Sequence, residues 1–287
     1  MLSAPDIVSV ILRALWFVLS FQAAGTAVFV ALFASELRDS IPAIRRSGLV
    51  AAALAVPVLC IHYALEAARM AGDFSGVFDA SLQGLVMRSS TSEAVALRVA
   101  GMGLVIVALR TPAARSRAVG LAGALLAGLA FTLTGHTSVL DHRALIAALL
   151  LSHVLIGMFW FGALLPLWQV SAREPAAVAG QVVSAFSRLA VWVVPLLLVA
   201  GVAMTVALVP GLATFAQPYG ELLIAKLAVF AVLMLLAAAN KRRFGPGISA
   251  GEPSAASRFR NTVVAELVLI CVALAVTACL TMFFSPE

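Results

Sequence analysis

The chain has 287 residues, of which 63% are hydrophobic and only 11% are charged. A soluble globular domain has about 25% charged residues, so this composition excludes an ordinary soluble protein. The net charge of +6 does not indicate nucleic-acid binding, because the basic residues gather in particular loops, as they do in membrane proteins.

Apolar segments of membrane length recur along the whole chain. Because a transmembrane helix needs about 20 apolar residues, we predict eight spans, at residues 9–34, 47–68, 93–110, 117–135, 142–168, 185–209, 221–240 and 261–284. Helices are expected because every backbone polar group must be satisfied inside the bilayer and because these runs lack the alternation of barrel strands. The polar stretches between them are too short for an independent core. We therefore predict an all-α, polytopic helix bundle with a single domain over residues 1–287.

The loop charges predict an orientation. The loops after the second, fourth and sixth spans carry only Arg69 and Arg88. The loops after the first, third, fifth and seventh spans carry many more basic residues, namely Arg38, Arg45, Arg46, Arg115, Arg117, Arg173, Lys241, Arg242, Arg243, Arg258 and Arg260. The basic side is expected to be cytoplasmic, which places both termini in the periplasm of a Gram-negative bacterium.

The second span carries a candidate metal-binding face. His62, Glu66 and Met70 follow one another at intervals of four residues, so they share one helix face that rises toward the outer surface. Imidazole and carboxylate suit divalent metals, and a thioether selects Cu(I). Glu66 could instead orient the imidazole, or this turn could be an interfacial one, with Glu66 and Arg69 at headgroup level. Arg13 in the first span is a plausible partner for Glu66.

Three of the four histidines lie close together in the sequence, at the end of the fourth span and within the fifth. His136, Asp141 and His142 are expected at the outer surface, where a short loop lets the two imidazoles converge. If residues 142–153 are helical, His153 shares a face with His142 to within about 20° but lies about 16 Å deeper. Metal–nitrogen bonds are about 2 Å long, so we interpret the cluster as an entrance followed by a deeper step. The alternative is a polar surface loop and a hydrogen-bonded core histidine.

Two further ionisable residues interrupt the last two spans. Lys226, like Arg13, is expected to balance charge rather than to bind a cation. Glu266 lies near the inner end of the last span, level with Asn240 and Arg242, and its expected role is structural.

The familiar catalytic and nucleotide-binding motifs are missing. The sequence has no P-loop, no GxGxxG, no HExxH and no GxSxG. We therefore do not expect an enzyme or an ATP-driven pump.

Several segments resemble a known family. HVLIGMFWFGALLPLW (153–168) resembles the signature helix of the CopD/PcoD copper-resistance membrane proteins, and GHTSVLDH (135–142) resembles their outer loop. Further matching segments follow in the family's order, namely FSRLA (186–190), PYGELLIAKLAVF (218–230), NKRR (240–243) and RFRNTVVAEL (258–267). The resemblance is best over residues 130–285 and looser in the first three spans, where it rests on Arg13 and Gly25.

The resemblance implies an eight-helix inner-membrane protein of copper homeostasis, often paired with CopC, a small periplasmic copper-binding protein. On this hypothesis His136 and His142 accept copper at the periplasmic mouth from a CopC-like donor. His62, with Glu66 or Met70, and His153 form deeper steps. Two alternatives stay open. One is a b-type cytochrome whose four histidines ligate two haems, and the other is a scaffold that delivers copper to oxidase subunits.

Overall fold

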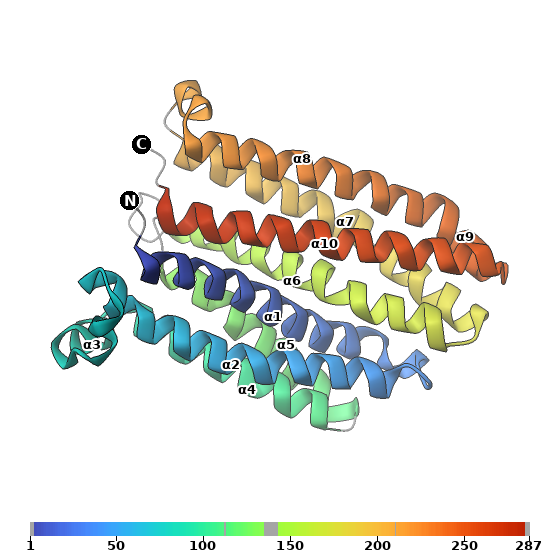
Figure 1. Ribbon diagram of the computed structural model, residues 1–287. Helices are drawn as coiled ribbons and strands as arrows, with labels where there is room; N and C mark the ends of the chain where they lie inside the picture. Colours follow the sequence, from blue (N-terminus) through green and yellow to red (C-terminus); the bar gives the residue numbers. More distant parts are fainter. Residues whose placement is uncertain (1–2, 112, 135–142, 210, 285–287) are drawn as a thin grey trace.

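The computed structural model describes residues 3–111, 113–134, 143–209 and 211–284, and the regular elements in this part of the chain are all helical (Figure 1). Eight of the helices are long and apolar enough to cross a membrane. They are α1 (Ala4–Phe33), α2 (Ile41–Ala71), α4 (Ser90–Arg110), α5 (Ala113–Leu129), α6 (Arg143–Arg173), α7 (Ala176–Leu208), α8 (Pro218–Ala239) and α10 (Pro253–Phe283). The prediction of an all-α, eight-span bundle is therefore confirmed.

Short elements connect these helices. They are the 3₁₀ turns η1 (Ala34–Glu36), η2 (Phe74–Phe78), η3 (Ala130–Leu133) and η5 (Leu212–Ala216), the π-helical segment η6 (Asn240–Phe244), and the helices α3 (Ala80–Met87) and α9 (Gly245–Ser249). The sequence analysis predicted no helix between the second and third spans, where α3 lies. Asp79 caps α3 by accepting hydrogen bonds from the backbone N–H groups of Ser81 and Leu82, so local capping accounts for this short helix.

The long helices extend beyond the apolar segments that predicted them. Helix α1 begins at Ala4 because Ser3 and Asp6 form a capping box, in which each side chain accepts a hydrogen bond from the other residue's backbone N–H. Helix α7 begins at Ala176 and α10 at Pro253, both earlier than predicted. Hydropathy detects only the apolar part of such a helix, whereas backbone hydrogen bonding continues through its polar ends.

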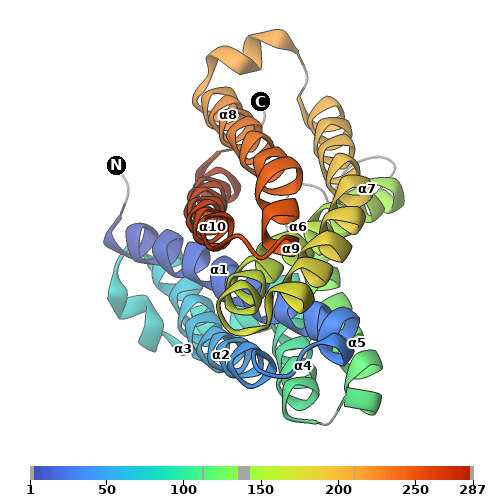
Figure 2. The same cartoon turned by 90° about the vertical axis from the view of Figure 1, so that its right-hand side faces the viewer.

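Helix α1 is the most buried of the eight spans and packs against α2, α5, α6 and α10. The end view in Figure 2 shows α2, α4 and α5 on one side of the bundle and α7, α8 and α10 on the other. Helix α6 contacts α1, α7 and α10. It therefore joins the N-terminal helices to the C-terminal ones.

The contact between α1 and α6 depends on two glycines. A Cβ atom on Gly25 would lie 1.9 Å from the carbonyl oxygen of Met158, and one on Gly162 would lie 2.4 Å from the Cα atom of Gly25. This close approach lets Gln22 Nε2 and Thr26 Oγ1 donate to the carbonyl oxygen of Gly162, over 3.2 and 3.4 Å. Small residues and interhelical hydrogen bonds of this kind drive helix packing in membranes.

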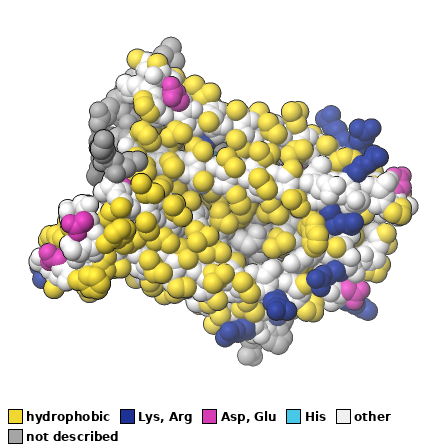
Figure 3. Space-filling model, viewed as in Figure 1, with side chains coloured by type: hydrophobic (Ala, Val, Ile, Leu, Met, Phe, Trp, Pro, Cys, Tyr) yellow, Lys and Arg dark blue, Asp and Glu magenta, His cyan; other side chains and the backbone are white. Residues whose placement is uncertain are grey.

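The two ends of the bundle differ in charge. Helix α1 begins and helix α10 ends at the same end of the bundle, which we call the terminal end (Figure 1). On the face shown in Figure 3, most Lys and Arg side chains gather at the opposite end, which we call the basic end. The prediction that the basic end faces the cytoplasm rests on this asymmetry.

Candidate functional site

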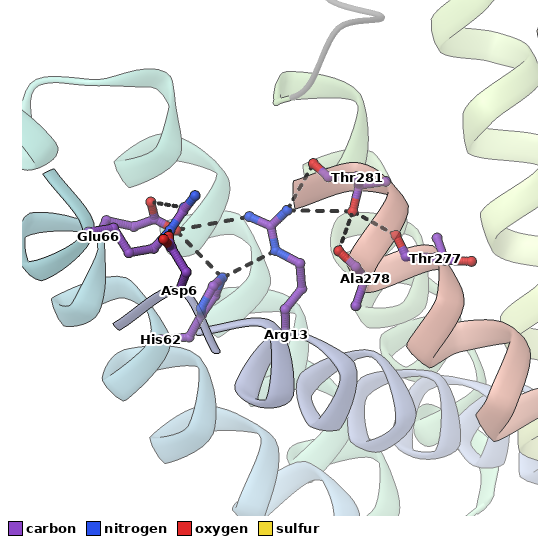
Figure 4. A network of polar contacts seen from close by, with 8 residues as sticks. Asp6, Arg13, His62, Glu66, Thr277, Ala278 and Thr281 are labelled. Carbon is purple, nitrogen blue, oxygen red and sulfur yellow. Dashed lines mark hydrogen bonds and ion pairs between the residues drawn. The ribbon is translucent and has the colours of Figure 1, made fainter. Parts of the chain in front are cut away.

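Arg13 joins three helices near the terminal end (Figure 4). Its Nε donates to Nε2 of His62 on α2 over 3.4 Å, and its Nη1 donates to the carbonyl and hydroxyl oxygens of Thr281 on α10 over 3.3 and 3.5 Å. Its Nη2 lies 4.0 Å from Oε1 of Glu66. The predicted pairing of Arg13 with Glu66 is therefore confirmed.

Glu66 belongs to a chain of alternating charges. Nη1 of Arg69 lies 2.9 Å from Oε2 of Glu66, and Nε of Arg69 lies 3.0 Å from Oδ1 of Asp6. Oε1 of Glu66 is 3.7 Å from Nε2 of His62, which is longer than a hydrogen bond. Glu66 thus contacts Arg69 more closely than it contacts the imidazole.

Neither ring nitrogen of His62 offers a free lone pair in this arrangement. Because Nε2 accepts a hydrogen bond from Arg13, the neutral ring must carry its proton on Nδ1. Nδ1 is buried and has no hydrogen-bond partner among the residues described. Copper could bind Nε2 only after Arg13 moved away. Met70, the third member of the predicted face, is 57% exposed at the end of α2.

His153 has a different geometry. Its Nδ1 lies 3.0 Å from the carbonyl oxygen of Leu197 on α7. Since a carbonyl oxygen only accepts hydrogen bonds, Nδ1 carries the proton and Nε2 keeps a free lone pair. Gly201, one turn further along α7, makes room for the ring, because a Cβ atom there would lie 3.3 Å from Cε1 of His153. Histidines that bind metals usually donate their other ring N–H in this way.

Lys226 on α8 is close enough to His153 to act on it electrostatically. The positive charge that was predicted to balance the site therefore acts on the deeper histidine. Arg13 lies beside His62. His62 has further basic neighbours, because Arg69 and Arg98 also act on it electrostatically.

The predicted outer mouth lies outside the described residues, since His136, Asp141 and His142 fall within 135–142. In the parts of the chain that are described, no three His, Cys, Asp or Glu side chains lie close enough together to hold a metal ion. His62 and Glu66 are brought together, and His153 lies on a different pair of helices. The predicted ligand set remains a hypothesis.

Arg98 on α4 is a site residue that the sequence analysis missed. Its guanidinium carbon lies 5.2 Å from the ring centre of Phe131 and 5.8 Å from that of Trp16. The signal available was a single arginine inside the predicted span 93–110. It was overlooked because a lone arginine a few residues from a span end resembles one that reaches the headgroups.

The half of the bundle toward the basic end contains a second group of polar residues. Asn240 Nδ2 donates to Oε1 of Glu266 over 2.6 Å, and the Thr262 hydroxyl donates to Oδ1 of Asn240. Asn240 and Glu266, together with Arg242, line a cavity of about 310 Å³ between α6, α7, α8 and α10 whose walls are otherwise mostly apolar. These three residues therefore lie at the same level of the bundle, as predicted.

Two protein-family models match separate segments of the chain. One, described as copper resistance protein D-like, N-terminal domain, matches residues 3–142, which include α1 to α5. The other, described as copper resistance protein D, matches residues 180–280, which include most of α7 to α10. Comparisons with curated proteins and with solved structures found no match. Helix α6, which carries His153, lies between the two matched segments.

Proposed function

We propose that this chain, which belongs to the CopD/PcoD family of copper resistance membrane proteins, accepts copper at the periplasmic face of the bacterial inner membrane and moves it across. Copper is its substrate rather than a resident cofactor. The eight long apolar helices make it a multi-pass membrane protein, and the basic end suits the cytoplasmic side. In this proposal the chain is a transporter and not an enzyme.

The geometry of His153 is the observation that carries this proposal. Its imidazole is held by the carbonyl oxygen of Leu197 and leaves Nε2 free to donate a lone pair. Imidazole suits copper as well as zinc and iron. A histidine fixed in this way inside a transmembrane helix is a functional candidate, because polar groups at membrane depth are costly.

The other predicted ligands are assigned to earlier steps. His136 and His142, with Asp141, receive copper at the mouth from a CopC-like periplasmic protein. His62 takes part only when Arg13 releases its Nε2 atom, with Glu66 or Met70 as an additional ligand. Arg13 and Lys226 balance charge beside the two inner histidines. Weak sites spaced along a path favour passage over storage, because each site must also release its ion.

The test compares His136→Ala, His142→Ala and His153→Ala with the wild type. Two quantities are measured for each, copper binding by the purified protein and the copper content of cells that express it. His153→Ala is expected to lower copper binding and to change cellular copper, because it removes the free Nε2 lone pair. The matched control is Ser152→Ala, since Ser152 is exposed and its hydroxyl only donates to the carbonyl of Ala148 in its own helix. Size-exclusion profiles show whether each variant folds. Unchanged binding and unchanged cellular copper in all three histidine variants would overturn the proposal.

A further inference from the structure

Arg98 is a partly buried cation whose Nε atom is fully buried, and it has no carboxylate partner among the described residues. The ion pairs found among the described residues join Arg13, His62 and Arg69 to Glu66 or Asp6, and none includes Arg98. Its guanidinium lies against the aromatic rings of Trp16 and Phe131. Such ring contacts offset only part of the cost of removing a charge from water. The described residues therefore leave Arg98 without a counter-charge.

The same region contains several buried donors without acceptors. Nε of Arg98, Nε1 of Trp16 and Nδ1 of His62 have no hydrogen-bond partner within the described chain. Trp16 is 1% exposed and His62 is 6% exposed, so bulk water does not satisfy these groups. Buried polar groups in native structures almost always have partners. Since all three atoms are N–H donors in this state, the partner that satisfies them must be an acceptor.

The three residues come from helices that pack against one another. Trp16 lies on α1, His62 on α2 and Arg98 on α4, and each of these helices contacts the other two. Arg98 is also close enough to His62 and to Arg13 to act on both electrostatically. A fourth buried group without a partner, the hydroxyl of Ser9, lies on α1 two turns before Trp16. Trp16, His62 and Arg98 therefore border one interhelical region.

The charges that the described part of the chain brings to this region do not cancel. The described residues around His62 include three guanidinium groups, those of Arg13, Arg69 and Arg98, and two carboxylates, those of Asp6 and Glu66. Both carboxylates contact Arg13 or Arg69. With His62 neutral, this count over the described residues leaves one positive charge in excess, and Arg98 is the guanidinium without an ion pair.

We propose that Trp16, His62 and Arg98 bind a small inorganic anion of the halide class, such as chloride, between α1, α2 and α4. A monoatomic anion fits the observations because it accepts hydrogen bonds from several directions and because Trp16 and His62 are almost fully buried. The anion cancels the excess charge next to His62. It thereby lowers the electrostatic barrier that the arginines raise against any cation entering from the terminal end.

The test uses the purified, copper-free protein in detergent, so its result does not depend on copper transport. Thermal unfolding is followed in bromide, chloride or gluconate at constant ionic strength, and crystals grown in bromide are examined for anomalous scattering. The wild-type protein is expected to gain several degrees in melting temperature in either halide, with saturation. A bromide peak is expected beside Arg98.

Two variants and a control test whether the halide response comes from the proposed site. Arg98→Met is expected to abolish the halide response, and Trp16→Phe, which keeps the ring and removes one N–H, to weaken halide affinity severalfold. Arg188→Met is the control, because Arg188 is exposed on α7 and contacts only Ser184, and it should respond like the wild type. A halide-independent melting temperature in the wild type would overturn the proposal. So would Arg98-dependent stabilisation by phosphatidylglycerol vesicles without any effect of halide, since the anion would then be a lipid phosphate.

Discussion

At the scale of single residues, arginine side chains determine which atoms of the polar groups near the terminal end are free to bind a ligand. Arg13 contacts α2 and α10 at once, and its hydrogen bond to Nε2 fixes the tautomer of His62. No described arginine hydrogen-bonds to the ring of His153, whose Nδ1 contacts the Leu197 carbonyl and whose Nε2 atom stays free. The two described histidines therefore have different chemical capacities, although the sequence analysis gave both the same role.

Glu174 offers a test by pH at the basic end. It lies between α6 and α7, and its Oε1 accepts hydrogen bonds from the Ser40 hydroxyl and from the backbone N–H groups of Arg38 and Ser40, at 2.6, 3.1 and 2.8 Å respectively. Burial alone would raise the pKa of Glu174, but these hydrogen bonds outweigh it and hold the pKa below its ordinary value of 4.5. The carboxylate therefore stabilises the folded state above pH 4.5, and this stabilisation is lost as the pH falls through the lowered pKa.

Replacing Glu174 with glutamine should show how much the carboxylate contributes to the free energy of unfolding. At pH 7 we expect Glu174→Gln to reduce the free energy of unfolding by about 1 kcal/mol, because charge-assisted hydrogen bonds become neutral ones. The difference from the wild type should shrink as the pH falls below 4.5. Thermal unfolding in detergent at several pH values measures this stability difference. Glu36→Gln is the control, because Glu36 is exposed. A difference that stayed constant from pH 7 to pH 3 would refute this account.

The Asn240–Glu266 pair predicts a compensating double variant. Asn240→Leu leaves the Glu266 carboxyl group buried without its amide donor, which should cost about 1–3 kcal/mol of stability. Asn240→Leu combined with Glu266→Leu removes both polar groups and should recover most of that loss. Thermal unfolding of both variants provides the measurement. If the double variant were less stable than Asn240→Leu, the buried carboxyl group of Glu266 would not be the source of the lost stability.

Sequence reasoning predicted one contact of the candidate site and missed others. The Arg13–Glu66 pair was predictable because opposite charges at similar depth in a bundle are expected to meet. The hydrogen bond from Arg13 to His62 was not, since it depends on how α1 and α2 pack side by side. For the same reason, the stacking of Arg98 on Trp16 and Phe131 could not be read from the spacing of residues in the sequence.

At the scale of elements, the crossing of α1 and α6 holds His153 in place relative to Arg13. Gly25→Ala would place a methyl group against the backbone of α6, and backbone cannot move aside as a flexible side chain does. We expect a loss of about 1–3 kcal/mol and weaker hydrogen bonds from Gln22 and Thr26 to Gly162. Thermal unfolding in detergent measures this loss.

Gly103 supplies the matched control for Gly25. It lies on an exposed face of α4, and a Cβ atom there would meet no heavy atom within 4 Å. Gly103→Ala should therefore be neutral or stabilise the protein by up to about 1 kcal/mol, because alanine favours helix more than glycine does. Equal effects of the two substitutions would show that the close approach of α1 and α6 does not limit stability.

The existence of the eight long helices was predictable, because apolar runs of membrane length have few other stable conformations. Their ends were not predictable from hydropathy. The start of α1 depends on the Ser3–Asp6 capping box, and α3 is only 8 residues long, too short to produce a transmembrane signal. Capping and loop geometry set these features, and hydropathy does not detect either.

At the scale of the whole molecule, the bundle has a terminal end and a basic end, and the account places the terminal end in the periplasm. A C-terminal alkaline phosphatase fusion should be active and a C-terminal fluorescent-protein fusion dark, because only the periplasm supports the phosphatase. Insertion of the same reporters at exposed Gly251, between α9 and α10, should give the reverse pattern. An active phosphatase at Gly251 would show that the proposed orientation is inverted.

Copper uptake by proteoliposomes tests the central claim most directly. Vesicles containing the purified protein are given radioactive copper, as Cu(I) and as Cu(II) in separate experiments, and internal copper is counted over time. The account predicts uptake above that of protein-free vesicles, a loss of most of it in His153→Ala, and wild-type rates in Ser152→Ala. Wild-type uptake equal to that of empty vesicles for both copper ions, or full uptake by His153→Ala, would contradict it.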